Sequence, residues 1–110
     1  MVKKTIKQVV KNYLNALKEQ GLPVRFGVIF GSQLTNKTDQ WSDIDVLVIS
    51  PIFDKIRRRK EINILWHTTI KIDSRIEPIP CGEDQWEKDD SSPIIEIARR
   101  EGEPVKLTED

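Results

Sequence analysis

The sequence is short of the residues that build disulfide bonds and zinc sites. Its 110 residues include one cysteine, Cys81, and one histidine, His67. A lone cysteine excludes an internal disulfide bond and a cysteine-based zinc site, and no base that would activate Cys81 is recognisable. We therefore expect Cys81 to be structural, because free cysteine usually behaves as a small buried hydrophobic side chain.

Long apolar runs are missing as well. No stretch approaches the roughly 20 apolar residues that a membrane-spanning helix needs. The first residues lead directly into a charged helical pattern, without the apolar segment of a secretion signal. These two absences predict a cytoplasmic protein that does not enter a membrane.

The chain also lacks net charge, because 18 basic residues balance 18 acidic ones. Without a global positive field there is little to gather a long nucleic acid, so we do not expect nucleic acid as a partner. The local basic run from Arg57 to Arg59 is interpreted as a solvated helix face. Any phosphate-bearing ligand must therefore be held by local geometry and metal ions.

The length and the apolar pattern predict one small layered domain over residues 1–110, since so short a chain cannot fill two cores. Periodicity and turn residues predict these elements in order: a helix over 5–20, strands over 24–30 and 43–50, a helix over 55–66, a strand over 70–79, a helix over 93–100 and a strand over 105–107. This order predicts an α/β (α+β) fold, with a small sheet flanked by helices.

Finer expectations concern the second helix and the third strand. We expect Trp66 to be a core residue, on a buried helix side that also carries Ile56, Ile62 and Leu65. We expect the third strand to end at Pro78, Pro80 and Gly82, because proline cannot continue a central hydrogen-bonded ladder.

Two carboxylates carry the chemical signal. Asp43 and Asp45 are separated by one residue on a predicted strand, so both side chains leave the same face, roughly 6 to 7 Å apart. We expect Leu47 on that face as well, and Ile44, Val46 and Val48 on the other. Two acids so close on an apolar strand repel each other and are costly to desolvate. A hard divalent cation removes that penalty, because Mg²⁺ takes carboxylate oxygens and leaves positions for water and phosphate.

Gly31 and Ser32 follow the first predicted strand. Glycine permits a sharp turn and a close approach of a ligand, and the serine supplies a hydroxyl and a backbone N–H where anions are favoured. A phosphate cradle that faces a metal site predicts triphosphate binding.

Gly31-Ser32, ten intervening residues and Asp43-Ile44-Asp45 resemble the signature of the nucleotidyltransferase superfamily, the DNA polymerase β-like fold. The short chain resembles its minimal nucleotidyltransferase (MNT) branch. The resemblance implies a nucleotidyltransferase fold with a mixed sheet, and it covers roughly residues 24–107. It also implies a third carboxylate from a later strand, for which we prefer Glu77 and keep Asp73 as the alternative.

By this resemblance the activity is in-line transfer of a nucleoside monophosphate, AMP from ATP, to an acceptor hydroxyl. Asp43, Asp45 and Glu77 would hold Mg²⁺, and Glu77 would also accept the proton of the attacking hydroxyl. Gly31 and Ser32 would bind the phosphates of the nucleotide.

The resemblance further implies a partner, because MNT proteins are often encoded beside a small helical HEPN protein. In such a toxin–antitoxin pair the MNT protein adenylylates the toxin. A homo-oligomer is compatible with the sequence, and transfer to a small molecule such as an aminoglycoside is the less favoured acceptor class.

The residues after Ser32 depart from the family pattern. Many relatives have an arginine or an aromatic residue there and a glycine soon after, whereas this chain continues with Gln33 and Leu34. Either Lys37 supplies the missing positive charge, or phosphate binding is weaker. The second reading makes the chain a nucleotide-binding or toxin-masking subunit with little turnover.

Overall fold

The computed structural model describes residues 2–34, 42–55 and 57–107. Its centre is a four-stranded mixed sheet in the order β3-β2-β1-β4. The strands are β1 (Phe26–Phe30), β2 (Ile44–Ile49), β3 (Ile76–Cys81) and β4 (Glu103–Lys106). β1 pairs antiparallel with β2 and β4, while β2 and β3 run parallel.

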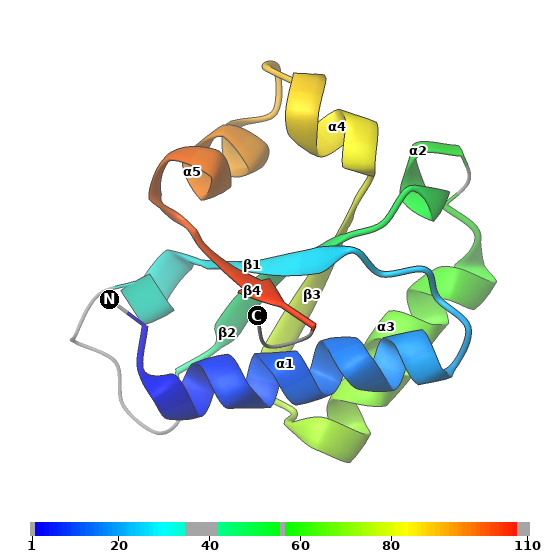
Figure 1. The fold of residues 1–110 in the computed structure, drawn as a ribbon, viewed down its shortest axis with the longest axis vertical. Helices are drawn as coiled ribbons and strands as arrows, with labels where there is room; N and C mark the ends of the chain where they lie inside the picture. The colour runs from blue at the N-terminus through cyan, green and yellow to red at the C-terminus, as the bar shows by residue number, and fades with distance from the viewer. Residues whose placement is uncertain (1, 35–41, 56, 108–110) are drawn as a thin grey trace.

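Helices cover both faces of this sheet. The helices are α1 (Lys4–Glu19), α2 (Ile52–Lys55), α3 (Arg59–Ile72), α4 (Glu83–Lys88) and α5 (Pro93–Glu101), and η1 (Gly31–Leu34) is a 3-10 turn. α1 and α3 lie on one face, whereas α4 and α5 lie on the other (Figure 1). This arrangement confirms the predicted α/β fold. In the part of the chain that the structure describes, no helix combines the length and the apolar character that crossing a membrane requires.

The alternation of side chains along β2 divides the core into two layers. Ile44, Val46 and Val48 belong to the cluster that includes the buried side of α1. Leu47 and Ile49 belong to the opposite cluster, beneath α5. Since side chains two residues apart share a face, Asp45 projects on the same side as Leu47, as the sequence predicted.

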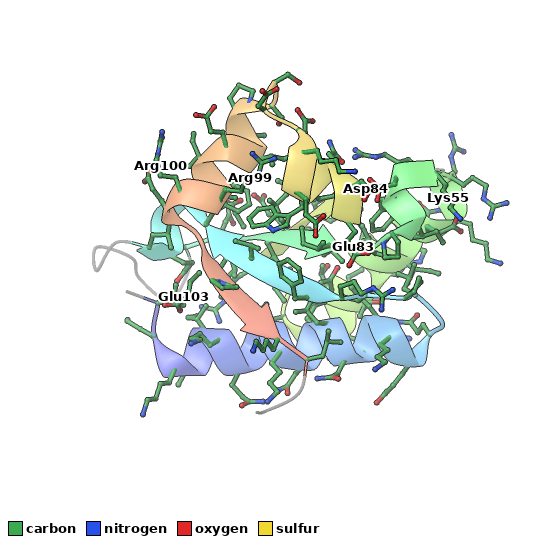
Figure 2. The ribbon with its side chains drawn as sticks, turned by 45° about the horizontal axis from the view of Figure 1, so that its top comes forward. Lys55, Glu83, Asp84, Arg99, Arg100 and Glu103 are labelled. Atoms are coloured by element: carbon green, nitrogen blue, oxygen red, sulfur yellow. The ribbon has the colours of Figure 1, made fainter. Side chains whose placement is uncertain are left out.

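α4 and α5 are joined by Arg99, which the sequence analysis did not single out. The Arg99 guanidinium donates hydrogen bonds to the carbonyls of Gln85, Trp86 and Asp89 at the end of α4, and it lies 5.9 Å from the centre of the Trp86 ring. Figure 2 shows Arg99 on α5, beside α4. Trp86 in turn packs edge-on against Phe26 of β1, with ring centroids 6.0 Å apart. These contacts hold both helices on the second face of the sheet.

The predicted boundary between the second long helix and the third strand was wrong. Residues 70–72 continue α3, and β3 begins only at Ile76. The helix continues past Trp66 because Leu65, Thr68 and Thr69 form its buried side, and the hydroxyls of the two threonines donate to the carbonyls of Ile64 and Trp66 within α3. The local sequence pattern does not show that Thr68 and Thr69 are buried residues of a helix.

The prediction that prolines end the third strand was also wrong. Pro78 and Pro80 lie inside β3 and pair with Val46 and Val48 of β2. β3 tolerates them because it is an edge strand and needs backbone donors on one side only.

Two predictions about single side chains had opposite outcomes. Trp66 was expected in the core, yet it is 47% exposed, because α3 buries Leu65, Thr68 and Thr69 instead. Ile56, which was expected on the same buried side, lies outside the described residues. Cys81 is buried as predicted, and burial raises the pKa of its thiol to about 11. A thiol with so high a pKa is a poor nucleophile at neutral pH.

Candidate active site

Gly31 brings the end of β1 against the carboxylate of Asp45. The last residue of β1, Phe30, pairs with Asp45 of β2, so the turn begins beside that side chain. Gly31 has a φ of +77°, and a Cβ at this position would lie 2.4 Å from Asp45 Oδ2. The backbone therefore approaches the carboxylate more closely than any other residue type would allow.

Glu77 lies on the other side of Asp45. The two residues are direct partners in the parallel pairing of β2 and β3. The pKa of the Glu77 carboxyl is raised by partial loss of hydration, by a side-chain hydrogen bond with Asp45 and by the charges of Asp43 and Asp45. The Glu77 and Asp45 carboxyl groups therefore lie close enough to interact directly.

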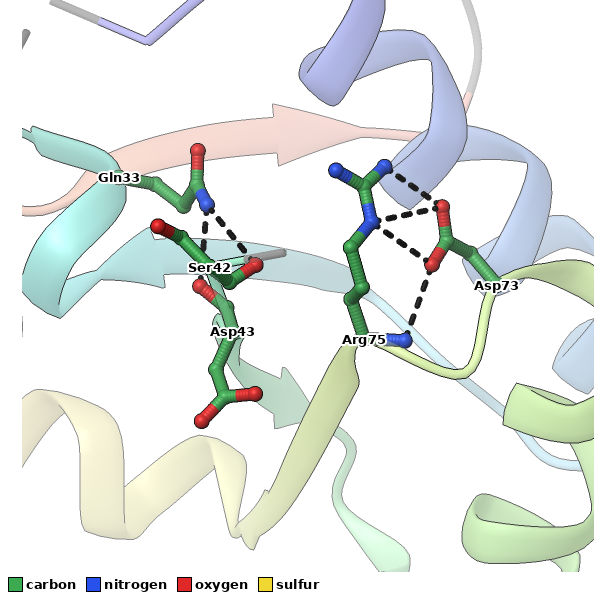
Figure 3. Close-up of polar contacts among 5 residues, drawn as sticks. All are labelled: Gln33, Ser42, Asp43, Asp73 and Arg75. Carbon is green, nitrogen blue, oxygen red and sulfur yellow. Dashed lines mark hydrogen bonds and ion pairs between the residues drawn. The ribbon is translucent and has the colours of Figure 1, made fainter. Parts of the chain in front are cut away.

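Asp43 completes the acidic group from the residue before β2. It is exposed, and it lies two residues before Asp45 and one residue outside β2. Its charge contributes to the raised pKa of Glu77, which places the three acids within electrostatic reach of one another. Figure 3 shows its carboxylate directed away from the Gln33 side chain.

Asp73, the alternative third carboxylate, is engaged elsewhere. It caps the end of α3 and forms an ion pair with Arg75, whose Nη2 lies 2.7 Å from Asp73 Oδ2 (Figure 3). Asp73 Oδ1 also accepts a hydrogen bond of 2.9 Å from the Arg75 backbone N–H. The geometry thus brings Glu77 to Asp45, and it gives Asp73 the task of shaping the turn before β3.

An Asp73→Asn variant tests this structural role. Hydrogen bonds from a charged partner contribute about 1.5–3 kcal/mol, and an amide retains some of them, so we expect a loss of about 1–2 kcal/mol in the free energy of unfolding at pH 7. Arg75 lowers the pKa of Asp73. The stabilisation is therefore present above the ordinary Asp pKa and is lost as the pH falls through the lowered value.

Urea unfolding of both proteins from pH 7 to pH 2 measures this difference. Asp90→Asn, at an exposed position between α4 and α5, is the matched control. A difference between wild type and Asp73→Asn that does not shrink in acid would contradict the assignment.

Other predicted site residues are only partly described. Gly31 and Ser32 open the 3-10 turn η1, so their backbone follows β1 as expected. The side chain of Ser32 lies outside what the structure describes, and so does Lys37. The phosphate-binding roles of Gly31 and Ser32 and the catalytic roles of the three carboxylates stay predictions.

The chemistry of the donor set fits a hard divalent cation, because the converging groups are carboxylate oxygens. Asp45 and Glu77 fit best, since they already interact. Across residues 2–34, 42–55 and 57–107, no three His, Cys, Asp or Glu side chains are gathered closely enough to enclose an ion. A cation would therefore draw Asp43 toward the Asp45–Glu77 pair.

In the sequence, Gln33 stands out only as a departure from a family pattern. In the structure its side chain is buried and its amide Nε2 lies 3.0 Å from the Asp43 carbonyl oxygen (Figure 3). Nothing in the local sequence marks this residue, because the contact spans the segment between η1 and β2.

Comparisons with known proteins agree with this architecture. Over 76% of this chain and 72% of the other, the fold resembles the crystal structure, at 1.40 Å resolution, of a proposed nucleotidyltransferase from Sulfolobus solfataricus. The TM-score is 0.59 and the sequence identity is 16%, so this likeness concerns the fold alone. No curated protein is significantly similar in sequence.

Residues 10–100 match the family described as "Nucleotidyltransferase domain". The matched range includes β1 to β3, the glycine turn and the three carboxylates. It agrees with the resemblance that the Gly31-Ser32 and Asp43-Ile44-Asp45 motifs carry. The chain belongs to the nucleotidyltransferase domain family.

Proposed function

We propose that this chain transfers a nucleoside monophosphate, AMP from ATP, to a hydroxyl group of a protein, and that it requires Mg²⁺. Family membership supports transferase activity in general, and nucleotidyltransferase domains generally use a divalent metal ion. The observation that carries the finer proposal is the contact of Asp45 with Gly31 on one side and with Glu77 on the other.

In this proposal Asp43, Asp45 and Glu77 hold the cation. Bound there, Mg²⁺ would stabilise the charge that develops on the attacking and leaving oxygens. The backbone after Gly31 would approach the triphosphate, because no side chain at that residue blocks it. Glu77, which pairs with Asp45 across the sheet, would accept the proton of the acceptor hydroxyl.

We further propose that the acceptor is a helical protein of the HEPN type and that the pair acts as antitoxin and toxin. Family resemblance supports this choice. Exposed apolar side chains add support, since Trp66 and Ile70 stand one turn apart on α3, at 47% and 76% exposure. Such apolar groups on a helix surface are suited to packing against another protein.

A second candidate is a nucleotide-binding or toxin-masking subunit with little turnover. The observation that favours it is the burial of Gln33, whose side-chain amide donates to the carbonyl of Asp43 before β2. The turn then offers a nucleotide fewer polar side chains than the family pattern does.

Two measurements separate these functions. Calorimetric titration of the chain with ATP and Mg²⁺ tests binding, and pyrophosphate release with a co-expressed HEPN-type protein tests turnover. Intact-mass analysis of that protein should show the added mass of one nucleoside monophosphate. Mg²⁺-dependent ATP binding without pyrophosphate or adduct, for every acceptor tried, would favour the subunit without turnover.

Glu77→Gln is the sharpest test of the proposed base. We expect transfer to fall by about 10² to 10⁴-fold, the usual contribution of a general base. The Tm of the metal-free protein should not fall, because the variant removes a carboxyl group that two neighbouring charges disfavour in its ionised form. Glu87→Gln on α4 is the matched control, since Glu87 is exposed. Wild-type turnover in Glu77→Gln would reject Glu77 as the base.

A further inference from the structure

Gln33 is a long polar side chain in a place where such residues are seldom found. It lies in η1 directly after the Gly31-Ser32 turn, and only 4% of it is exposed. Glutamine is mostly exposed in folded proteins, so a buried one needs hydrogen-bond partners. Its Nε2 donates to the carbonyl of Asp43 at 3.0 Å and to the carbonyl of Ser42 at 3.4 Å (Figure 3).

These hydrogen bonds reach residues that lie outside the strand pairing of the sheet. The pairing of β2 with β1 reaches only to Asp45, and its pairing with β3 reaches only to Ile44. Asp43 lies two residues before the first limit and one residue before the second, so the ladder does not set its position. The Gln33 amide reaches that residue from η1 and holds its carbonyl group.

The neighbouring residue is held from the opposite side. The Ile44 N–H donates a hydrogen bond of 2.9 Å to the carbonyl of Arg75, which precedes β3. Arg75 is itself fixed by Asp73 in the turn. The start of β2 is therefore held by hydrogen bonds from η1 and from the turn before β3. Asp43 and Asp45 are the residues directly before and after Ile44 in the chain.

We propose that Gln33 is a positioning residue of the nucleotidyltransferase site. By holding the carbonyls of Ser42 and Asp43, its side-chain amide places the Asp43 carboxylate beside that of Asp45 in the geometry that one cation requires. This inference rests on the proposed function. It gives Gln33 a role through the backbone, without contact to nucleotide or metal.

Glutamine suits this task chemically. Its amide has two N–H donors, which matches two carbonyl acceptors, and it carries no charge that would be costly to bury. A glutamate at this position could not donate when ionised, and it would face two carbonyl oxygens. Methionine has nearly the same length and shape as glutamine but no donor.

Gln33→Met therefore removes the hydrogen bonds and preserves the volume. The experiment titrates Mn²⁺ into the full chain with a non-hydrolysable ATP analogue and measures the dissociation constant by electron paramagnetic resonance. Loss of a residue that orients a metal ligand usually weakens the metal by 10- to 100-fold. We expect the Mn²⁺ dissociation constant to rise about tenfold, at the lower end of that range.

A second readout follows the backbone without metal. Amide hydrogen exchange of Ile44 should become faster in Gln33→Met, because the two hydrogen bonds from η1 to the residues before β2 are then lost. The matched control is Gln20→Met, since Gln20, directly after α1, also donates from its side chain, to Thr68 Oγ1 at 2.7 Å. Gln20→Met should leave both readouts at wild-type values. Gln33→Asn, which keeps an amide on a shorter side chain, repeats the test if the methionine variant does not fold.

The outcomes distinguish this inference from the proposed function. If wild type binds Mn²⁺ and the analogue while Gln33→Met binds them equally well, the role of Gln33 is rejected and the proposed function stands. Faster exchange of Ile44 with unchanged metal affinity also rejects it, because Gln33 is then purely structural. If wild type itself does not bind Mn²⁺ with the analogue, the proposed function fails and this inference fails with it.

Discussion

Asp45→Asn is expected to lower kcat/KM for nucleotidyl transfer by at least about 10³-fold, with little change in thermal stability. Asp45 is the central acid of the site, between the glycine turn and Glu77. Charge stabilisation by a bound metal is worth several kcal/mol in the transition state, and each 1.36 kcal/mol corresponds to about a tenfold change in rate. An amide has the shape of the carboxylate but is a much weaker ligand for a hard cation.

The stability of the same variant distinguishes loss of chemistry from loss of fold. Removing the Asp45 charge relieves repulsion within the acidic group, so the Tm of the metal-free protein should stay the same or rise. Asp84→Asn on α4 is the matched control, because α4 follows the far end of β3 (Figure 2). Pyrophosphate release within about tenfold of wild type in Asp45→Asn would contradict the proposed metal site.

The faces of β2 could be predicted from the sequence because a strand has a fixed period of two. Alternation alone placed Asp45 on the side of Leu47 and opposite Val46, which the structure confirms. The glycine turn could also be predicted from the sequence, because it directly follows a run of β-branched and aromatic residues that is typical of a strand. The functional roles of Asp45 and of the glycine turn are not decided by these positions and require the variants described here.

The third carboxylate could not be decided from the sequence. Asp73 and Glu77 would lie on the same face of a strand only if one strand contained both. In the structure α3 extends to Ile72, and β3 contains only Glu77. The end of that helix turns Asp73 toward Arg75 and moves the start of β3 to Ile76. Strand register, which depends on tertiary pairing, then aligns Glu77 with Asp45.

Contacts between distant segments were beyond local patterns for the same reason. The Arg99 hydrogen bonds that tie α4 to α5 join residues 10 to 14 positions apart. The Gln33 hydrogen bonds reach 9 and 10 positions, across the segment that precedes β2. In both cases a polar side chain donates hydrogen bonds to backbone carbonyls of another segment. The spacing of residues in the sequence does not predict such contacts.

Gly31 offers a test in which backbone cost and site geometry can be separated. Its φ of +77° lies in the left-handed region, where a side chain costs roughly 1–2 kcal/mol per residue. Gly21, after α1, has a φ of +96° and therefore carries a similar backbone cost. The surroundings differ, since a Cβ at Gly21 would meet nothing within 4 Å, whereas one at Gly31 would meet Asp45 Oδ2.

Gly31→Ala should therefore lose about 10²-fold in transfer rate as well as about 1–2 kcal/mol in stability, because the Asp45 carboxylate must rotate away and a misplacement of about 1 Å can cost that much. Gly21→Ala should show a similar loss of stability and keep wild-type turnover. Urea unfolding and pyrophosphate release on both variants measure the two effects. Equal activity in the two variants would mean that the close approach of Gly31 to Asp45 does not matter for the chemistry.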